Sequence, residues 1–401
     1  MGAPAARVYE LSKYWVRFGH EVTVLTGFPN HPTGNIPSEY RSKFQRLTCR
    51  ETVDGINVIR TWLYPAPNRR SSERILNYSS FFVSACIRSL LIPRHDLVIA
   101  TSPQLLVGLS GWLIGRLAKC PSVFEVRDLW PESLLASGVS HERSALIRIL
   151  DRISAFLYKH SDRIVVVTES FRDNLVQCRD VPRSKVNVIT NAVDTDLFDV
   201  GPSRELIRAS LNLRDRFVLS YVGTIGLAHG LETLLTAARN LKKALPQVLF
   251  LIIGEGADKE RLRNLATEWK LDNVQFLDQR PREEIPKILA ACDACLVMLR
   301  RSELFKTVLP SKMFEILAAG RPVILAVDGE SRKLLEQAEG GIYVEPEDSA
   351  ALTVAITSLV ENPDECRRLG QNGRKFVFKN FSRDQTALDY LSILQSVQKG
   401  S

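Results

Sequence analysis

The chain has 401 residues, of which 45% are apolar and 24% charged, and its formal net charge is +8. This length predicts two domains, and the balance of apolar and charged residues excludes an intrinsically disordered chain. The positive charge is concentrated in residues 1–200, which contain 25 Lys and Arg and 19 Asp and Glu. This excess of positive charge suits an anionic lipid surface or a phosphorylated substrate. Nucleic acid is a weaker candidate, because the sequence has no basic stripe interleaved with aromatic residues.

The first half of the chain alternates short β-rich runs with helical patterns. It opens on a predicted helix from Val8 to Phe18, although a doubly wound domain normally begins with a strand. A later helix is predicted over Ser144–Tyr158, whose apolar residues share one face. The predicted strands are Val22–Thr26, Ile56–Arg60, Leu97–Ala100, Ser122–Val126, Arg163–Val167 and Lys185–Ile189. Because they are apolar throughout, they indicate a parallel sheet covered on both faces.

The segment Ile75–Pro93 is the most apolar stretch near the start of the chain. Arg88 and the flanking arginines make it too polar for a transmembrane span. Two interpretations remain: a helix that packs against its domain, or a helix that lies on a membrane surface. In the second, Arg69, Arg70 and Arg74 are expected to bind anionic lipid.

The second half repeats the scheme after a polar, turn-rich connection at 191–202. Its predicted strands are Phe217–Val222, Val248–Ile253, Val274–Leu277, Ala294–Met298, Pro322–Ala326 and Gly341–Val344. Cys292 and Cys295 have C-x-x-C spacing but lie in an apolar run, so we expect them to be buried and expect no metal site. The odd number and scatter of the cysteines favour a reducing, cytoplasmic compartment.

Two successive blocks of this kind predict an α/β protein with two doubly wound, Rossmann-like domains facing a cleft. The predicted boundaries are 1–197 for the N-terminal domain and 198–380 for the C-terminal domain. A final helix over 381–401 is expected to pack back towards the first domain.

Three turns follow predicted strands of the second half and precede helices. They lie at Gly223–Gly226, Gly254–Gly256 and Pro310–Lys312. A helix N-terminus offers unpaired N–H groups to a phosphate, and glycine lets a phosphate approach the backbone. Any α/β fold needs such turns to change direction, but three at equivalent strand ends favour phosphate binding.

The segment Phe305–Gly320 is the most informative part of the second half. Lys306, Ser311 and Lys312 supply cations and a hydroxyl just before a helix, and Glu315 follows one turn later among apolar residues. A carboxylate there needs hydrogen-bonding partners. The vicinal hydroxyls of a ribose are such partners, and an internal salt bridge or an exposed position is the alternative.

A second charged cluster directly follows a predicted strand of the first half. It consists of Glu125, Arg127, Asp128 and Glu132. Asp128 can act as a base towards an acceptor hydroxyl, and Arg127 can hold a phosphate. The alternative is a salt-bridge cluster that stabilises the domain.

Several of these segments resemble glycosyltransferase family 4, in the branch of bacterial polysaccharide-biosynthesis enzymes similar to WbuB. The resemblance covers the whole chain, in order, and is carried by Gly2–Arg7, Gly19–Thr26, Val126–Ser133, Asn191–Asp194 and Pro310–Gly320. It implies a GT-B fold, a nucleotide-diphosphate sugar donor, retention of anomeric configuration and no metal requirement.

The family's signature is a pair of glutamates with seven residues between them. The second glutamate corresponds to Glu315 and is implied to bind the donor ribose, whereas the first position holds Thr307. The family's diphosphate-binding Arg and Lys correspond to Thr224 and His229, so both charges are missing here. The groups left to neutralise the diphosphate are Lys312, Lys306, Arg127 and backbone amides.

The resemblance assigns further roles. Gly2 corresponds to a glycine near the donor phosphates, Arg280 and Pro281 lie where the base is expected to stack, and Asp128 matches the aspartate of a His-Asp pair. Relatives carry a strand before the counterpart of Gly2. The sequence as written is therefore expected to lack the first strand of its N-terminal domain and to fold poorly.

The sequence thus predicts a retaining glycosyltransferase, with catalytic roles for Asp128, Glu315 and Arg127. It is expected to be cytoplasmic, with a peripheral membrane contact, and to use a nucleotide-sugar donor, UDP-linked above all. The acceptor is expected to be lipid-diphosphate-linked or a saccharide, in O-antigen, capsule or exopolysaccharide synthesis. The alternatives are a sugar-nucleotide epimerase and a non-catalytic sugar-nucleotide-binding subunit; an NAD-dependent oxidoreductase is disfavoured because no G-x-G-x-x-G opens a strand–helix unit.

Overall fold

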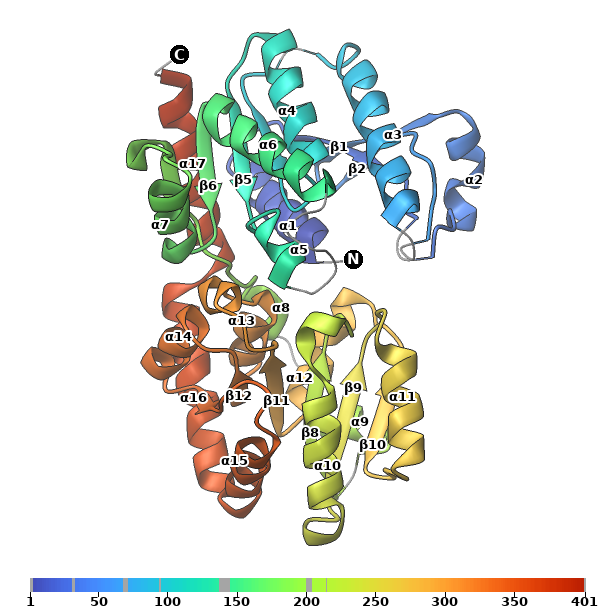
Figure 1. Ribbon diagram of the computed structural model, residues 1–401, viewed down its shortest axis with the longest axis vertical. Coiled ribbons are helices and arrows are strands. Elements are labelled where there is room, and N and C mark those ends of the chain that lie inside the picture. Colours follow the sequence, from blue (N-terminus) through green and yellow to red (C-terminus); the bar gives the residue numbers. More distant parts are fainter. Residues whose placement is uncertain are drawn as a thin grey trace. The chain divides into compact units, whose positions relative to one another are not determined.

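The protein is described by a computed structural model that covers residues 3–30, 33–67, 71–93, 95–136, 145–199, 204–213 and 215–399. The chain divides into two compact units. The N-terminal unit comprises Pro4–Leu135, Val139–Ile189 and Thr386–Ser401, and the C-terminal unit is formed mainly by Thr190–Gln385 (Figure 1).

The C-terminal unit is built on one sheet of six parallel strands in the order β10-β9-β8-β11-β12-β13. Its strands are β8 (Phe217–Val222), β9 (Val248–Ile253), β10 (Val274–Leu277), β11 (Ala294–Met298), β12 (Val323–Ala326) and β13 (Gly341–Tyr343). Strands β9 and β11 are buried along their whole length. This explains why their sequences are continuously apolar rather than alternating.

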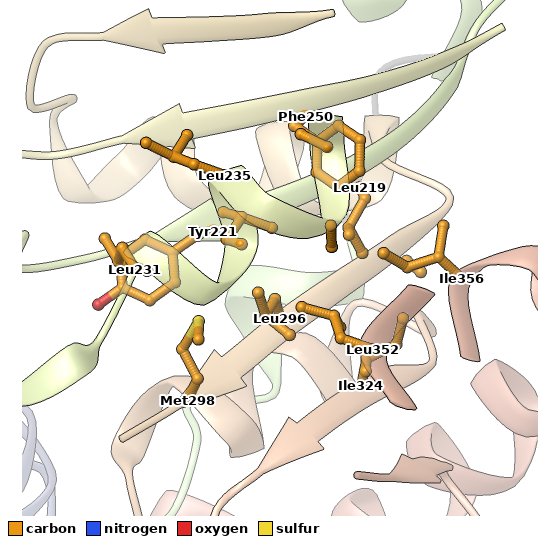
Figure 2. Close-up of a cluster of buried hydrophobic side chains, with 14 of the residues drawn as sticks. Leu219, Tyr221, Leu231, Leu235, Phe250, Leu296, Met298, Ile324, Leu352 and Ile356 are labelled. Atoms are coloured by element: carbon orange, nitrogen blue, oxygen red, sulfur yellow. The ribbon is translucent and has the colours of Figure 1, made fainter. Parts of the chain in front are cut away.

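Helices cover both faces of this sheet. They are α8 (Asp196–Asp199), α9 (Arg204–Ser210), α10 (Glu232–Ala244), α11 (Lys259–Glu268), α12 (Ile285–Ala291), α13 (Ser311–Ala318), α14 (Glu330–Ala338), α15 (Ser349–Glu361) and α16 (Pro363–Asn380). Short 3-10 turns are η2 (Leu227–His229), η3 (Arg282–Glu284) and η4 (Leu304–Thr307). One core lies under α10, α11 and α15, the other under α12, α13 and α14. Figure 2 shows part of the first core, where Leu219, Phe250 and Ile356 come from β8, β9 and α15.

The N-terminal unit contains two sheets. Its strands are β1 (Thr23–Gly27), β2 (Thr48–Val53), β3 (Ile56–Thr61), β4 (Val98–Thr101), β5 (Ser122–Val126), β6 (Arg163–Val166) and β7 (Val186–Val188). One sheet has the order β1-β3-β2, with β2 antiparallel to β3, and the other is parallel in the order β4-β5-β6-β7.

The N-terminal unit contains both the first and the last helix of the described chain. They are α1 (Ala3–Arg17), α2 (Ser38–Gln45), α3 (Ser71–Ser89), α4 (Leu105–Ala118), α5 (Glu132–Ala136), α6 (Ala145–His160), α7 (Glu169–Cys178) and α17 (Arg383–Lys399), with a 3-10 turn η1 at Arg183–Lys185. Trp15 of α1 donates from its indole Nε1 to the Ala387 carbonyl at 3.0 Å and packs edge-on against Tyr390. These contacts join α1 and α17 in one buried cluster.

The predicted fold class, α/β with two Rossmann-like domains, is confirmed. Each strand predicted above is present, to within one or two residues at its ends. Two features of the N-terminal unit differ from the prediction. The strands form two sheets rather than one, because β1 and β4 pair on one side only within the described residues. The antiparallel strand β2 was also missed, although Asp54 and Gly55, both at positive φ, form the turn of a β-hairpin with β3.

Candidate active site

The strand order of the C-terminal sheet reverses between β8 and β11. These strands pair at only two positions, at the start of β11. In open α/β sheets, ligands bind outside the carboxyl ends of the strands at such a switch point. His229, in η2 after β8, lies across this point, with its Nδ1 3.3 Å from the carbonyl oxygen of Met298 at the end of β11.

The glycines in the turns after β8 and β9 have different structural roles. Gly254 has φ +150°, and a Cβ there would lie 1.9 Å from the Gly223 carbonyl oxygen; a Cβ at Gly256 would lie 2.1 Å from the Ile225 carbonyl oxygen. Both glycines therefore allow the turn after β9 to pack against the turn after β8. A Cβ at Gly223 would lie 3.0 Å from Nζ of Lys312, so this glycine leaves room for a cation.

Lys312 places its amine at the switch point. Its Nζ is shielded from solvent, has no hydrogen-bond partner within the described part of the chain, and lies 3.9 Å from the centroid of the Tyr221 ring. Burial lowers the pKa of Lys312 to about 7, although Glu315 opposes the shift. Burial and the nearby Lys312 lower the pKa of His229 to about 3, despite its hydrogen bond to Met298. At neutral pH the site therefore contains an uncharged imidazole and an amine that is only partly protonated.

The start of α13 adds backbone donors. Pro310 occupies the N-cap without a side-chain cap, and Ser311 is the half-buried first residue of the helix. The first N–H groups of a helix have no partner within the helix and favour anions. One turn later, Glu315 Oε1 accepts from Arg282 Nη1 at 3.0 Å. The internal salt bridge considered above is therefore present, and it orients the Glu315 carboxylate.

The other predicted donor residues lie in different surroundings. Lys306 pairs with Glu303 at 2.7 Å and lies 4.0 Å from Asp328, so its charge is already largely balanced. Arg280 follows β10, and its Nε is shielded from solvent without a hydrogen-bond partner among the described residues. Gly2 lies outside the described residues.

A pocket of about 240 Å³ lies beyond the carboxyl ends of β11 and β12. Its lining includes Arg300, Glu303, Lys306, Asp328 and Glu345. Side chains of both charges offer donors and acceptors to a polar, hydroxyl-rich ligand. Within the described ranges, no group of three or more His, Cys, Asp and Glu residues can hold a metal ion.

In the N-terminal unit, the predicted charged cluster divides into two parts. Glu125 accepts from Arg7 Nε at 3.0 Å and from the Thr101 hydroxyl at 2.9 Å. Burial alone would raise the pKa of Glu125, but Arg7 and Arg127 hold it below its usual range. Glu132 forms an ion pair with Arg179. Both glutamates therefore form ion pairs with arginines of the same unit, which agrees with the salt-bridge cluster considered as the alternative.

Arg127 and Asp128 remain as the chemical candidates of this cluster. They follow β5, and the Arg127 backbone N–H donates to the Ser102 hydroxyl at 2.7 Å. Burial raises the pKa of Asp128 to about 6, although Arg127 acts against the shift. Burial also lowers the pKa of the Arg127 guanidinium. A carboxylate with a pKa in this range suits proton transfer near neutral pH.

Two residues near Lys312 and Glu315 were not predicted from the sequence. Tyr221 lies in a continuously apolar strand, so its contact with Lys312 had no signal in the sequence. Arg282 is 33 residues from Glu315, and only the fold brings the two together. The family resemblance did point to Arg280 and Pro281 in the turn after β10, but it implied that they stack against the donor base.

Two family models match the chain. A glycosyl transferase 4-like domain covers residues 2–192, and the model of glycosyl transferases group 1 covers residues 203–376. WcaI of Escherichia coli K12, described as a glycosyl transferase of colanic acid biosynthesis, is 25% identical over 358 residues, covering 86% of each chain.

Solved structures share the fold. Sucrose-phosphate synthase from Thermosynechococcus elongatus has a TM-score of 0.79 at 21% identity, covering 100% of this chain and 94% of that one. HepE of Anabaena, solved in complex with UDP-glucose, has a TM-score of 0.71 at 16% identity, covering 94% of this chain and 100% of its own. The chain therefore belongs to the glycosyltransferases of GT-B type, with a glycosyl transferase 4-like domain followed by a group 1 glycosyl transferase domain.

Proposed function

We propose that this glycosyltransferase moves a sugar from UDP to a lipid-diphosphate-linked or saccharide acceptor, with retention of configuration, in bacterial polysaccharide assembly. The observation that carries the proposal is the buried amine of Lys312 at the switch point, which has no hydrogen-bond partner among the described residues. It lies at the uncapped start of α13, one turn from Glu315. The complex of HepE with UDP-glucose supports a UDP-sugar donor, and the description of WcaI supports polysaccharide synthesis. O-antigen and lipopolysaccharide are two products of this class.

Each donor group has a residue that suits it. Lys312 and the N–H groups around Ser311 suit the diphosphate, because cations and helix N-termini both stabilise phosphate. Glu315 suits the ribose, since a carboxylate accepts from two vicinal hydroxyls. We assign Arg280 to the base. Lys306 lines the pocket whose charged side chains can bind the hydroxyl groups of the sugar. Gly254 contributes by allowing the turns after β8 and β9 to pack closely, and Gly223 leaves room for the Lys312 amine.

The acceptor is assigned to Asp128 and Arg127 of the N-terminal unit. An ionised Asp128 can accept the proton of the acceptor hydroxyl, or orient it, while Arg127 can hold an acceptor phosphate. We propose that the bond from the anomeric carbon to the β-phosphate oxygen breaks as the acceptor oxygen attacks from the same side. The main contribution of the protein is to position the reactants and stabilise the departing diphosphate.

The cationic side chains of the protein can stabilise the negative charge of the departing diphosphate, so we propose that catalysis requires no metal ion. Full sugar transfer in the presence of excess EDTA is the expected result. An activity that falls with EDTA and returns with a divalent cation would contradict this part of the proposal.

We also propose a peripheral contact with an anionic membrane. No helix in the described ranges is long and apolar enough to cross a bilayer. The helix α3 nevertheless exposes apolar side chains at helical spacing, Leu76 (49% exposed), Val83 (53%) and Ile87 (63%), and Leu90 (67%) follows its end. This stripe and the basic first half of the chain suit a helix at the lipid interface. Arg69 and Arg70, also expected to bind lipid, lie outside the described residues.

One assay distinguishes the leading function from its alternatives. Purified protein is incubated with a panel of UDP-sugars, with and without lipid-diphosphate-linked or free saccharide acceptors. Transfer that needs an acceptor supports the proposal. Conversion of the donor alone identifies an epimerase, and UDP binding without turnover on any acceptor identifies a binding subunit.

A further inference from the structure

The amine of Lys312 lies in surroundings that do not match a permanent positive charge. Its Nζ is excluded from solvent and has no hydrogen-bond partner within the described part of the chain. Its contact is the face of the Tyr221 ring at 3.9 Å, which stabilises an ammonium only modestly. An isolated buried ammonium is costly, so such a group either neutralises or awaits an anion.

Among the described residues, no group near this amine accepts a hydrogen bond from it. On its own helix, Glu315 is held by Arg282 at 3.0 Å. On β8, the Tyr221 hydroxyl donates to the carbonyl of Thr224 at 2.7 Å. From η2, His229 turns its Nδ1 to a backbone carbonyl, and the nearby Lys312 helps to keep its imidazole neutral.

We propose that Lys312 is the cation that meets the donor diphosphate, and that binding of the diphosphate makes its amine take up one proton. The inference rests on the proposed function. A bound diphosphate places negative charge beside the amine and supplies the missing hydrogen-bond acceptors, and both effects favour the ammonium. The proton comes from the solvent and forms one new N–H bond on the amine, and no other covalent bond changes.

This arrangement accounts for the unusual residues at the expected diphosphate site. Thr224 and His229 stand where the family resemblance implies two cations. A protonated His229 would repel Lys312 in the same buried space, so the site disfavours two positive charges when no anion is bound. The chain thus keeps the empty site nearly neutral and charges it when the donor binds.

Isothermal titration calorimetry with UDP, in buffers of different ionisation enthalpy, measures the proton uptake. From the lowered pKa of about 7, the wild-type protein is expected to take up about 0.9 proton per UDP at about pH 8 and about 0.1 at about pH 6. Its affinity for UDP should fall about tenfold per pH unit above about pH 8. The terminal phosphate of UDP titrates as well, so variants measured with the same ligand provide the correction.

Two variants of Lys312 and one control complete the test. Lys312→Arg keeps a permanent charge and is expected to bind UDP without the wild-type proton uptake. Lys312→Met is expected to lower UDP affinity at least tenfold and to remove the fall in affinity above about pH 8, leaving only the pH dependence that the UDP phosphate causes. The control Lys379→Met, at an exposed position on α16, should match the wild type.

The outcomes separate the inference from the function on which it rests. Equal proton uptake in wild type and Lys312→Arg overturns the inference, as does UDP binding by wild type without uptake or an unchanged affinity in Lys312→Met. Should the arginine variant not fold, the pH dependence of wild type against Lys312→Met decides the same question. Failure of the folded wild type to bind UDP contradicts the proposed function, and the inference with it.

Discussion

Arg282 and Glu315 form an ion pair across 3.0 Å, although their positions in the chain are 33 apart. The guanidinium comes from η3, after β10, and the carboxylate from the first turns of α13. The two side chains remain 25% and 21% exposed. The pair therefore holds the Glu315 carboxylate near the edge of the sheet where we propose that the donor binds, without burying it completely.

Removing Arg282 should weaken UDP binding indirectly. In Arg282→Ala, Glu315 keeps its charge but loses a partner that orients it, and we expect UDP affinity to fall about three- to tenfold. Arg282→Lys should restore part of the affinity, because it keeps a positive charge near the Glu315 carboxylate. Equal affinities for wild type and Arg282→Ala, measured by calorimetry, would show that the pair does not position Glu315.

The close packing of the two glycine turns predicts a large effect on stability. Gly254→Ala places a Cβ 1.9 Å from a carbonyl oxygen at a backbone φ of +150°, so we expect a loss of about 2–4 kcal/mol in the free energy of unfolding. Gly226→Ala is the matched control, since its Cβ would meet nothing closer than 3.7 Å and its φ is −115°. It should cost less than about 1 kcal/mol. Urea unfolding distinguishes the two, and similar losses would contradict the packing role.

The buried carboxylate of Asp128 predicts opposite effects on stability and activity. Its pKa is raised from 3.8 to about 6, so between these values the folded protein holds a proton that the unfolded chain has released. Stability therefore falls as the pH rises through this window. Asp128→Asn removes this cost and is expected to raise the free energy of unfolding by up to about 3 kcal/mol at neutral pH, with little difference below about pH 4.

Sugar transfer by the same variant should decrease. The wild-type rate is expected to rise with pH through about 6 as Asp128 ionises, whereas Asp128→Asn should be at least about tenfold slower and flat across this range. Rates measured from about pH 5 to about pH 8 test this. A variant with the wild-type rate and pH profile would exclude Asp128 as the base.

The exposed stripe on α3 predicts membrane binding. The double variant Ile87→Ser and Leu90→Ser should reduce cosedimentation with vesicles containing anionic phospholipid several-fold, because burial of apolar side chains contributes to interfacial binding. Val354→Ser on α15 is the matched control: Val354 is 69% exposed but belongs to the C-terminal unit. Unchanged vesicle binding by the double variant would contradict the assignment of α3.

The sequence allowed the fold to be predicted further than the site. Continuous apolar runs such as Val248–Ile253 have few alternatives to a buried parallel strand, and they were located correctly. The strand β2 was missed because its residues are mostly polar and partly exposed, so the Asp54-Gly55 turn was its clearest signal. The sequence could not show that Lys306 has an acidic partner whereas the Lys312 amine has no hydrogen-bond partner among the described residues, because this difference arises only from the fold.

The central claim is that the start of α13, with Glu315 behind it, binds the diphosphate and ribose of a sugar nucleotide. The most direct measurement is calorimetric titration of UDP into wild type, Glu315→Ala and the control Glu336→Ala, which removes an exposed carboxylate paired with Arg332 on α14. The account predicts at least about tenfold weaker UDP binding for Glu315→Ala, with the control at the wild-type value. A folded Glu315→Ala protein that binds UDP as tightly as the wild type would contradict it.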